Sequence, residues 1–220
     1  KMTITAAMVK ELREKTGAGF MDSKKALEQC EGDMEKAMEY LRQKGIASAE
    51  KKMGRVAAEG LVKVAFADDN KTAAIVEVNS ETDFVSKNVE FVEFVEGLAK
   101  VALDAETTDI EAFKAMAYEG STVQEVLTDK IAKIGENMNL RRFARFDGNV
   151  VGYIHMGGRI GVMVNVEYAD FSDEAKDAAR DVAMHIAAMN PAYLDEASVP
   201  AEDLEKEKHF ILAQMKEDPK

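Results

Sequence analysis

The spacing of the hydrophobic residues changes along the chain, and this change limits the fold more than any other feature. In the first 45 residues, apolar side chains recur every three or four positions, which is the period of an amphipathic helix. In residues 60–67 they alternate with other residues, and residues 72–78 form a run rich in β-branched side chains, as strands do. The sequence therefore predicts an α+β protein that begins with a helical unit.

Glycines divide residues 1–45 into three short predicted helices that form one small bundle domain. Met34 and Met38 fall at helical spacing and are expected in its core. The third helix should end at a glycine, as the first two do, because glycine readily adopts the left-handed conformation that closes a helix. Thr5 is predicted to cap the first helix, which ends at Gly17-Ala18-Gly19. Asp22 is predicted to cap the second, which ends at Gly32, and Asp33 the third, which ends at Gly45.

The remaining residues predict a connector and two related α+β subdomains. Residues 46–59 are rich in alanine and charge, which favours a helical connector. The first subdomain, 60–138, is expected to contain a hairpin of strands 60–67 and 72–78, a helix from about Val89, and a helical stretch from Asp109 to Lys133.

A similar order of elements returns in the second subdomain, 139–220, and indicates an internal repeat. Its predicted elements are a strand at 140–146, a hairpin of 150–156 and 159–167 around Gly157-Gly158, a helix at 173–189 and a final helix from Ala201 to Lys216. In the helix at 173–189, Ala178, Val182, His185, Ile186 and Met189 are expected to form the apolar face. Each half is thus predicted to be an antiparallel sheet covered by helices.

The charge balance limits the classes of partner. Lys and Arg number 29 against 41 Asp and Glu, a formal charge of −12, which disfavours direct binding to nucleic acid or to an anionic membrane. No apolar run approaches the roughly 18 residues that span a bilayer, so we expect a soluble, cytosolic protein. Cys30 is the only cysteine and fits a reducing compartment.

The histidines give no sign of a metal site, because His155, His185 and His209 are far apart in the sequence. From its neighbours alone, His185 is expected to be buried or half-buried in a helix face, and His209 to lie on a solvated one. His155 alone would also be interpreted as structural. We expect no metal and no cofactor.

Residues 80–85 separate a predicted strand from the long helix that follows it. Judged alone, Asp83 supports a helix start, with Ser80 or Thr82 as its cap, and Phe84 belongs to the core. An acid or base role for Glu81, Asp83 and His155 is a weak alternative, since no catalytic spacing accompanies them.

Five motifs in order resemble the bacterial elongation factor Ts family, whose members act as guanine-nucleotide exchange factors for the translational GTPase elongation factor Tu. They are TAAMVKELREKTGAGFMDSKKAL (5–27), GDMEKAMEYLRQKG (32–45), EVNSETDFVSKN (77–88), KIAKIGENMNLRRF (130–143) and Arg159-Ile160-Gly161-Val162. The resemblance implies an amino-terminal domain similar to ubiquitin-associated domains, a core of two α+β subdomains, and no enzymatic activity.

The resemblance also implies which residues contact elongation factor Tu. Asp83 and Phe84 are expected to enter the partner near its nucleotide-bound magnesium, and Phe20 stands where the family usually has methionine. The implied contact residues are Leu12, Arg13, Phe20 and Met21 in the first domain, Thr82, Asp83, Phe84 and Val85 in the core, and His155 in the second hairpin.

The alternative function is a ubiquitin-associated-type adaptor, which would account for residues 1–45 only. Lys1 precedes Met2 and is interpreted as an addition ahead of the native start. Many relatives continue beyond the position of Lys220 into a helical hairpin and a carboxy-terminal module, so we expect a truncated or short chain. Self-association stays open.

Overall fold

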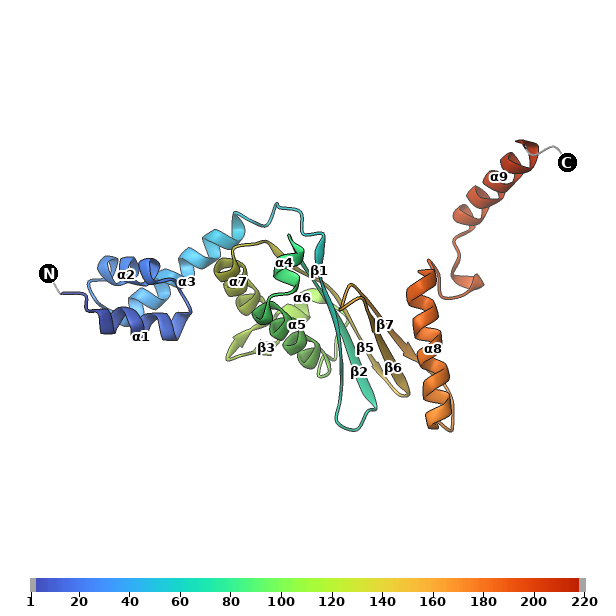
Figure 1. Ribbon diagram of the computed structural model, residues 1–220, viewed down its shortest axis with the longest axis horizontal. Coiled ribbons are helices and arrows are strands. Elements are labelled where there is room, and N and C mark those ends of the chain that lie inside the picture. The colour runs from blue at the N-terminus through green and yellow to red at the C-terminus, as the bar shows by residue number, and fades with distance from the viewer. Residues whose placement is uncertain (1–2, 218–220) are drawn as a thin grey trace.

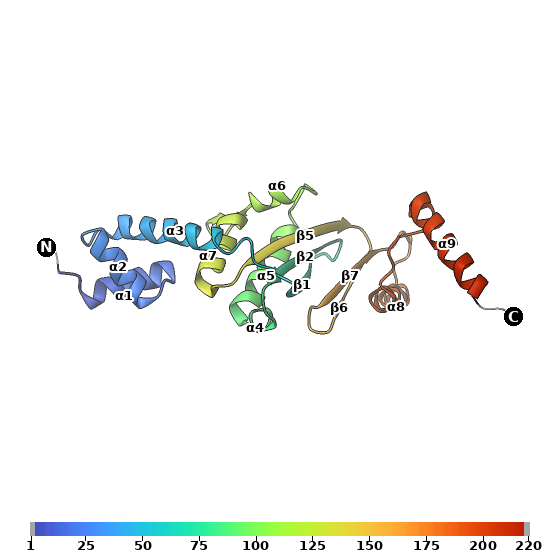
Figure 2. The same ribbon diagram turned by 90° about the horizontal axis from the view of Figure 1, so that it is seen from above.

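The computed structural model describes residues 3–217 (Figure 1). The interpreted start at Lys1-Met2 and the end at Lys220 lie outside this range. The protein is elongated, with a three-helix unit at one end, a mixed sheet and helix core in the middle, and two helices towards the other end (Figure 2). This mixture of helices and small antiparallel sheets confirms the predicted α+β class.

The amino-terminal unit consists of α1 (Ala6–Thr16), α2 (Phe20–Gln29) and α3 (Met34–Glu50). Thr5 caps α1 by accepting a hydrogen bond from the Met8 N–H, and Asp33 caps α3 in the same way, as predicted. Gly17 ends α1 in the left-handed conformation, with φ of 67°. The buried side chains that join the three helices are Val9, Leu12, Ala26, Leu27 and Ala37.

Two helix boundaries differ from the prediction. Gly19 rather than Asp22 precedes α2, and Asp22 lies in its first turn, where it binds Lys44 at 2.5 Å. Helix α3 continues through Gly45 to Glu50, so the connector is helical only over its first residues. Gly45 packs against a later helix, α7 (Val123–Ile134), where an added Cβ would lie 3.4 Å from the Ala132 Cβ, and this close packing outweighs the local tendency of glycine to end a helix.

The central sheet has the order β1-β2-β5, with all neighbours antiparallel, and consists of β1 (Glu59–Phe66), β2 (Thr72–Ser80) and β5 (Met138–Asp147). Helix α5 (Val89–Ala102) covers it with fully buried side chains that include Phe91 and Leu98. The strand at 140–146 was predicted to belong to the second subdomain, 139–220. In the structure it is part of β5, which pairs with β2 of the first subdomain, so this assignment was wrong.

The stretch from Asp109 to Lys133 is not a continuous helix, contrary to the prediction. It contains α6 (Ile110–Lys114), the short strands β3 (Ala117–Tyr118) and β4 (Ser121–Thr122), and α7 (Val123–Ile134). Glu119 and Gly120 turn the chain with positive φ angles of 50° and 79°. Thr122 then starts α7 with a reciprocal capping box to Glu125, a signal for a new helix.

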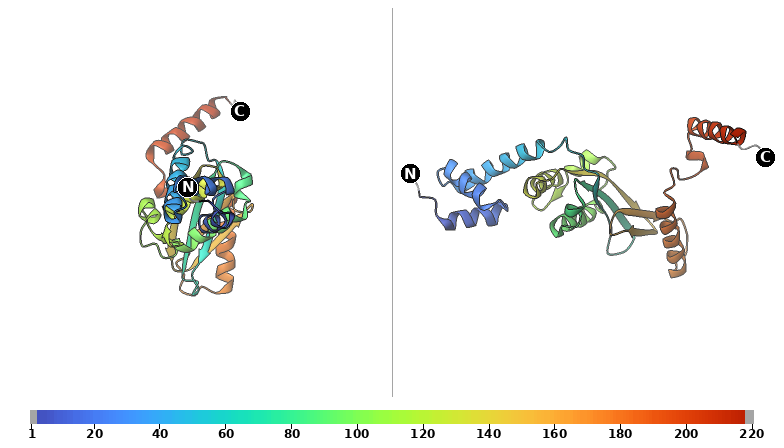
Figure 3. Two further views of the ribbon diagram at one scale, coloured as in Figure 1. Left: turned by 90° about the vertical axis from the view of Figure 1, so that its left-hand side faces the viewer. Right: turned by 45° about the horizontal axis from the view of Figure 1, so that its top comes forward.

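The second hairpin consists of β6 (Val150–His155) and β7 (Ile160–Asn165), joined through Gly157 and Gly158 as predicted. Helix α8 (Asp173–Met189) packs on this hairpin, as α5 packs on β1 and β2. The hairpin joins the central sheet where the Val62 N–H donates to the Gly158 carbonyl oxygen at 2.7 Å. A short 3₁₀ turn, η1 (Glu196–Ser198), leads to α9 (Ala201–Glu217), which stands away from the core (Figure 3, right).

Candidate functional site

The segment 82–85, called the tip below, is separated from the end of β2 by Glu81 and contains most of the short helix α4 (Asp83–Ser86). Thr82 rather than Ser80 is its N-cap, since the Thr82 hydroxyl accepts from the Val85 N–H at 3.5 Å. Ser80 is fully buried, and its hydroxyl donates to the Thr82 carbonyl oxygen at 3.0 Å. The tip therefore starts at a fixed point at the end of the central sheet.

The two apolar residues of the tip have opposite environments. Val85 is 8% exposed and belongs to the core cluster, whereas Phe84 is 83% exposed. Successive side chains of an α-helix point about 100° apart, so burying Val85 turns Phe84 outward. The interpretation of Phe84 as a core residue, made from local sequence alone, is therefore wrong.

Asp83 carries the negative charge of the tip. The Lys87 ammonium donates to its carboxylate at 2.6 Å, and this hydrogen bond lowers the pKa of Asp83. The charges of Lys87 and Arg159 lower that pKa further. Asp83 is therefore ionised at neutral pH, on the same short turn as the exposed Phe84.

Two acidic side chains fasten the tip to neighbouring segments. Glu136, between α7 and β5, accepts from the Thr82 N–H at 3.0 Å and from the Thr82 hydroxyl at 2.6 Å. Glu81 accepts from the Asn137 N–H at 2.5 Å and pairs with Arg55 at 3.4 Å. Residues 135–137 lie within the KIAKIGENMNLRRF motif, but Glu136 is 54 positions from Thr82 in the sequence, so no local signal predicts this contact.

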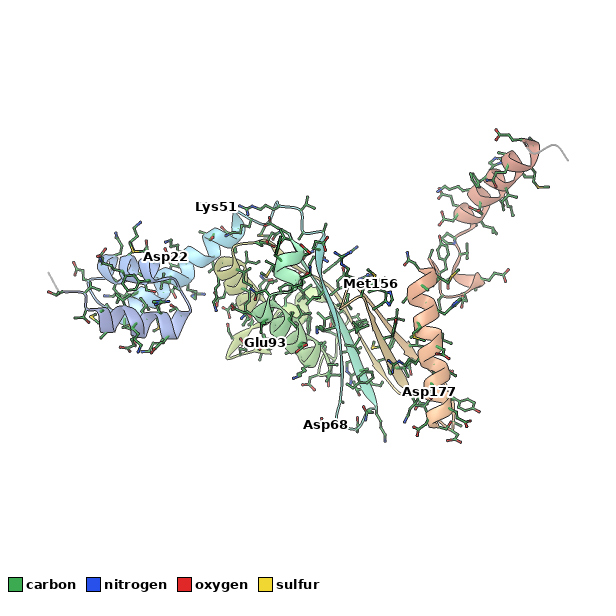
Figure 4. All side chains as sticks on the ribbon, in the orientation of Figure 1. Asp22, Lys51, Asp68, Glu93, Met156 and Asp177 are labelled. Atoms are coloured by element: carbon green, nitrogen blue, oxygen red, sulfur yellow. The ribbon has the colours of Figure 1, made fainter. Side chains whose placement is uncertain are left out.

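His155 lies at the end of β6, exposed to solvent, with its Nδ1 atom 2.8 Å from the Tyr153 hydroxyl. The β6–β7 turn is at the same end of the sheet as the tip, because Arg159 pairs with Glu59 at 3.1 Å and Glu59 is the β-sheet partner of Ser80. Figure 1 shows α4 and this turn on the same side of the core, and Figure 4 labels Met156 in the turn.

The candidate residues of the amino-terminal unit surround the loop between α1 and α2. Arg13 is exposed near the end of α1, and Phe20 and Met21, at 49% and 68% exposed, start α2. Leu12 is fully buried among the three helices. Its side chain supports the bundle and is not available for the partner contact that the resemblance implies.

The described residues offer little for a metal or catalytic site. Within residues 3–217, no three or more His, Cys, Asp and Glu side chains gather as metal ligands would. The Glu81 carboxylate is occupied by Asn137 and Arg55, which leaves it poorly suited to acid or base chemistry. His185 was expected to be buried or half-buried but is exposed, and His209 is exposed as predicted. Every helix in this range is too short or too polar to cross a bilayer.

Comparison with known proteins identifies the family. The sequence profile of the family described as Elongation factor TS matches residues 81–220. The chain is 54% identical over 217 residues to elongation factor Ts of Clostridium novyi (strain NT), a match that covers 96% of this chain and 71% of that protein. It is 50% identical over 225 residues to elongation factor Ts of a Nitratiruptor species, a match that covers 100% of this chain and 74% of that protein. The chain belongs to the elongation factor Ts family.

Proposed function

We propose that this protein acts in translation elongation as a guanine-nucleotide exchange factor, promoting the release of GDP from elongation factor Tu. The observation that carries the proposal is Phe84, which is 83% exposed on a turn that is otherwise tied down by buried and hydrogen-bonded neighbours. An exposed aromatic ring on a rigid support is suited to insertion into another protein. Membership of the elongation factor Ts family supports elongation factor Tu as that protein.

The physical mechanism is displacement, in which no covalent bond is made or broken. A GTPase of this kind holds GDP through backbone amides, a lysine and an octahedral Mg²⁺ whose geometry tolerates little change. In our proposal the Phe84 ring separates structural elements beside the nucleotide, and the Asp83 carboxylate disturbs the waters around Mg²⁺. Thr82 fixes the turn and Val85 anchors it from behind.

The remaining candidate residues extend the proposed contact at both ends of the molecule. His155 lies at the tip end of the sheet and would add a second core contact. Arg13, Phe20 and Met21 offer an exposed cationic and apolar surface to the nucleotide domain of elongation factor Tu. The buried Leu12 acts indirectly, by holding the helices that present them.

Thermodynamic linkage gives the proposal a quantitative consequence. If the protein lowers the affinity of elongation factor Tu for GDP by some factor, GDP must lower the affinity for this protein by the same factor. Incoming GTP can therefore displace the protein after GDP has left. The complex with nucleotide-free elongation factor Tu should be the tightest one.

A stopped-flow measurement of fluorescent GDP release from elongation factor Tu tests the proposal directly. Unlabelled GDP is added in excess, with and without this protein, and the release rate should rise with its concentration and then saturate. Denatured protein serves as the control. An unchanged release rate would refute the exchange function, and capture of a ubiquitin-like protein by residues 3–50 would instead support the adaptor function.

A further inference from the structure

We propose that Glu136 is a positioning residue for exchange: its carboxylate fixes Thr82 and thereby the turn that presents Asp83 and Phe84. The inference rests on the proposed exchange function and extends it to a residue outside the tip. Glu136 is 54 positions from Thr82 in the sequence and reaches it from the loop after α7.

The contact between these two residues is bidentate. One carboxylate oxygen of Glu136 accepts from the Thr82 N–H at 3.0 Å and the other accepts from the Thr82 hydroxyl at 2.6 Å. The same hydroxyl accepts from the Val85 N–H at 3.5 Å. Because its proton is directed to Glu136, the hydroxyl oxygen is oriented to act as the cap of α4.

The tip needs such an anchor because α4 has only four residues. A single helical turn is not stable on its own, so its geometry depends on the groups that hold its two ends. Val85 anchors one side through burial, and Glu136 anchors the other through charge-assisted hydrogen bonds. Phe84, between these two anchors, then projects in one direction.

The loop that carries Glu136 is itself held in place. Gly135 ends α7 in the left-handed conformation, with φ of 90°, and so redirects the chain towards the tip. The next residue, Asn137, is 7% exposed, donates its N–H to Glu81 and donates from its side chain to the Arg55 carbonyl oxygen at 2.8 Å. The Glu136 carboxylate is therefore a prepared anchor for Thr82.

Preorganisation of the tip should affect the maximal rate of GDP release more than the half-saturating concentration. The exposed residues of the amino-terminal unit are unaffected by Glu136, so initial association should be unchanged. Without the Glu136 anchor, the tip would have to become ordered while Phe84 inserts. The entropy cost of that ordering would slow the release of GDP. Loss of the anchor should therefore lower the maximal rate of GDP release and leave the half-saturating concentration nearly constant.

The test compares Glu136→Ala with Glu106→Ala, a matched change at an exposed glutamate beyond the carboxyl end of α5. We expect Glu136→Ala to reduce the maximal release rate about tenfold, with a half-saturating concentration within about twofold of the original, and Glu106→Ala to change neither. Glu136→Gln, which keeps one acceptor for the Thr82 N–H, should fall between them.

Two further measurements separate positioning from general damage. In a double-variant cycle, the effects of Thr82→Val and Glu136→Ala on the maximal release rate should be less than additive, because both variants remove the hydrogen bond between the Thr82 hydroxyl and Glu136. Amide hydrogen exchange across residues 82–88 should become faster in Glu136→Ala and stay unchanged in Glu106→Ala. Additive effects, unchanged exchange protection or an unchanged maximal rate would each overturn the inference.

These results are distinguishable from failure of the exchange function itself. If the original protein does not accelerate GDP release, the proposed function fails, and the positioning role in exchange fails with it. If the original protein accelerates release and Glu136→Ala does so equally well, only the role of Glu136 is refuted.

Discussion

Replacing Phe84 with alanine should slow the release of GDP from elongation factor Tu and leave the stability of this protein nearly unchanged. The side chain is 83% exposed, so its truncation removes few contacts within the protein, and the free energy of unfolding should change by less than about 0.5 kcal/mol. Phe91, at the start of α5, is fully buried, and its truncation should lower the free energy of unfolding by about 3–5 kcal/mol.

The expected functional effect of Phe84→Ala follows from the surface that the ring can bury in a partner. Burying an apolar side chain of this size contributes about 1.5–3 kcal/mol, which corresponds to roughly tenfold to hundredfold in rate if the contact forms only during insertion. The release of GDP from elongation factor Tu should slow by that factor. Phe84→Leu keeps part of the apolar surface and should lose less.

Urea unfolding followed by circular dichroism gives the stabilities, and stopped-flow release of fluorescent GDP gives the rates. The reasoning fails if Phe84→Ala destabilises the protein as much as Phe91→Ala does, since the ring would then be part of the core. It also fails if Phe84→Ala leaves the protein stable and GDP release as fast as before, since the exposed ring would then have no role in exchange.

Three further changes have expected outcomes. Met21→Ala, at a 68% exposed position, should raise the half-saturating concentration in the release assay and leave the maximal rate nearly unchanged. Gly60→Ala should lower the unfolding free energy by more than about 2 kcal/mol in urea titrations, because Gly60 has φ of 139° and an added Cβ would collide with the Val78 carbonyl oxygen. Burial raises the pKa of Glu77, but hydrogen bonds, above all from Arg142, outweigh it and hold this pKa below the usual 4.5. That stabilisation is present above pH 4.5 and is lost as the pH falls through the folded-state pKa, so Glu77→Gln should flatten the acid side of the stability profile measured by thermal unfolding.

Local signals in the sequence predict two of the three amino-terminal helix starts, but they predict the helix faces less well. Thr5 and Asp33 cap α1 and α3 as expected, because a cap depends on residues within one turn. In α8 the predicted face included Val182 and His185, yet the structure buries Ala179 and Ala183. Small side chains allow the helix to approach the β6–β7 hairpin closely, and which face does so depends on a partner surface that local periodicity does not contain.

At the candidate site, too, local sequence predicts some features, while others depend on contacts between distant segments. Thr82 as a cap was one of two local choices, and the structure selects it because Ser80 remains buried at the end of β2. The exposure of Phe84 was implied only by the family resemblance, since a lone aromatic residue is more often buried. Glu136 could not be recognised from the sequence, because its contact with Thr82 arises only when the α7–β5 loop folds against the end of the sheet.

The two proposed contact regions lie on one connected framework, and this bears on how exchange could work. Helix α3 passes from the amino-terminal unit onto α7, and Lys133 of α7 lies beside Gly17, within 3.6 Å of a Cβ placed there. Lys133 also donates at 2.9 Å to Glu90, in the first turn of α5 and shortly after the end of α4. Binding through Phe20 and Met21 would therefore hold the tip at a high effective concentration near the nucleotide site. The contact through the amino-terminal unit would thus set the half-saturating concentration, and the tip would set the maximal rate of GDP release.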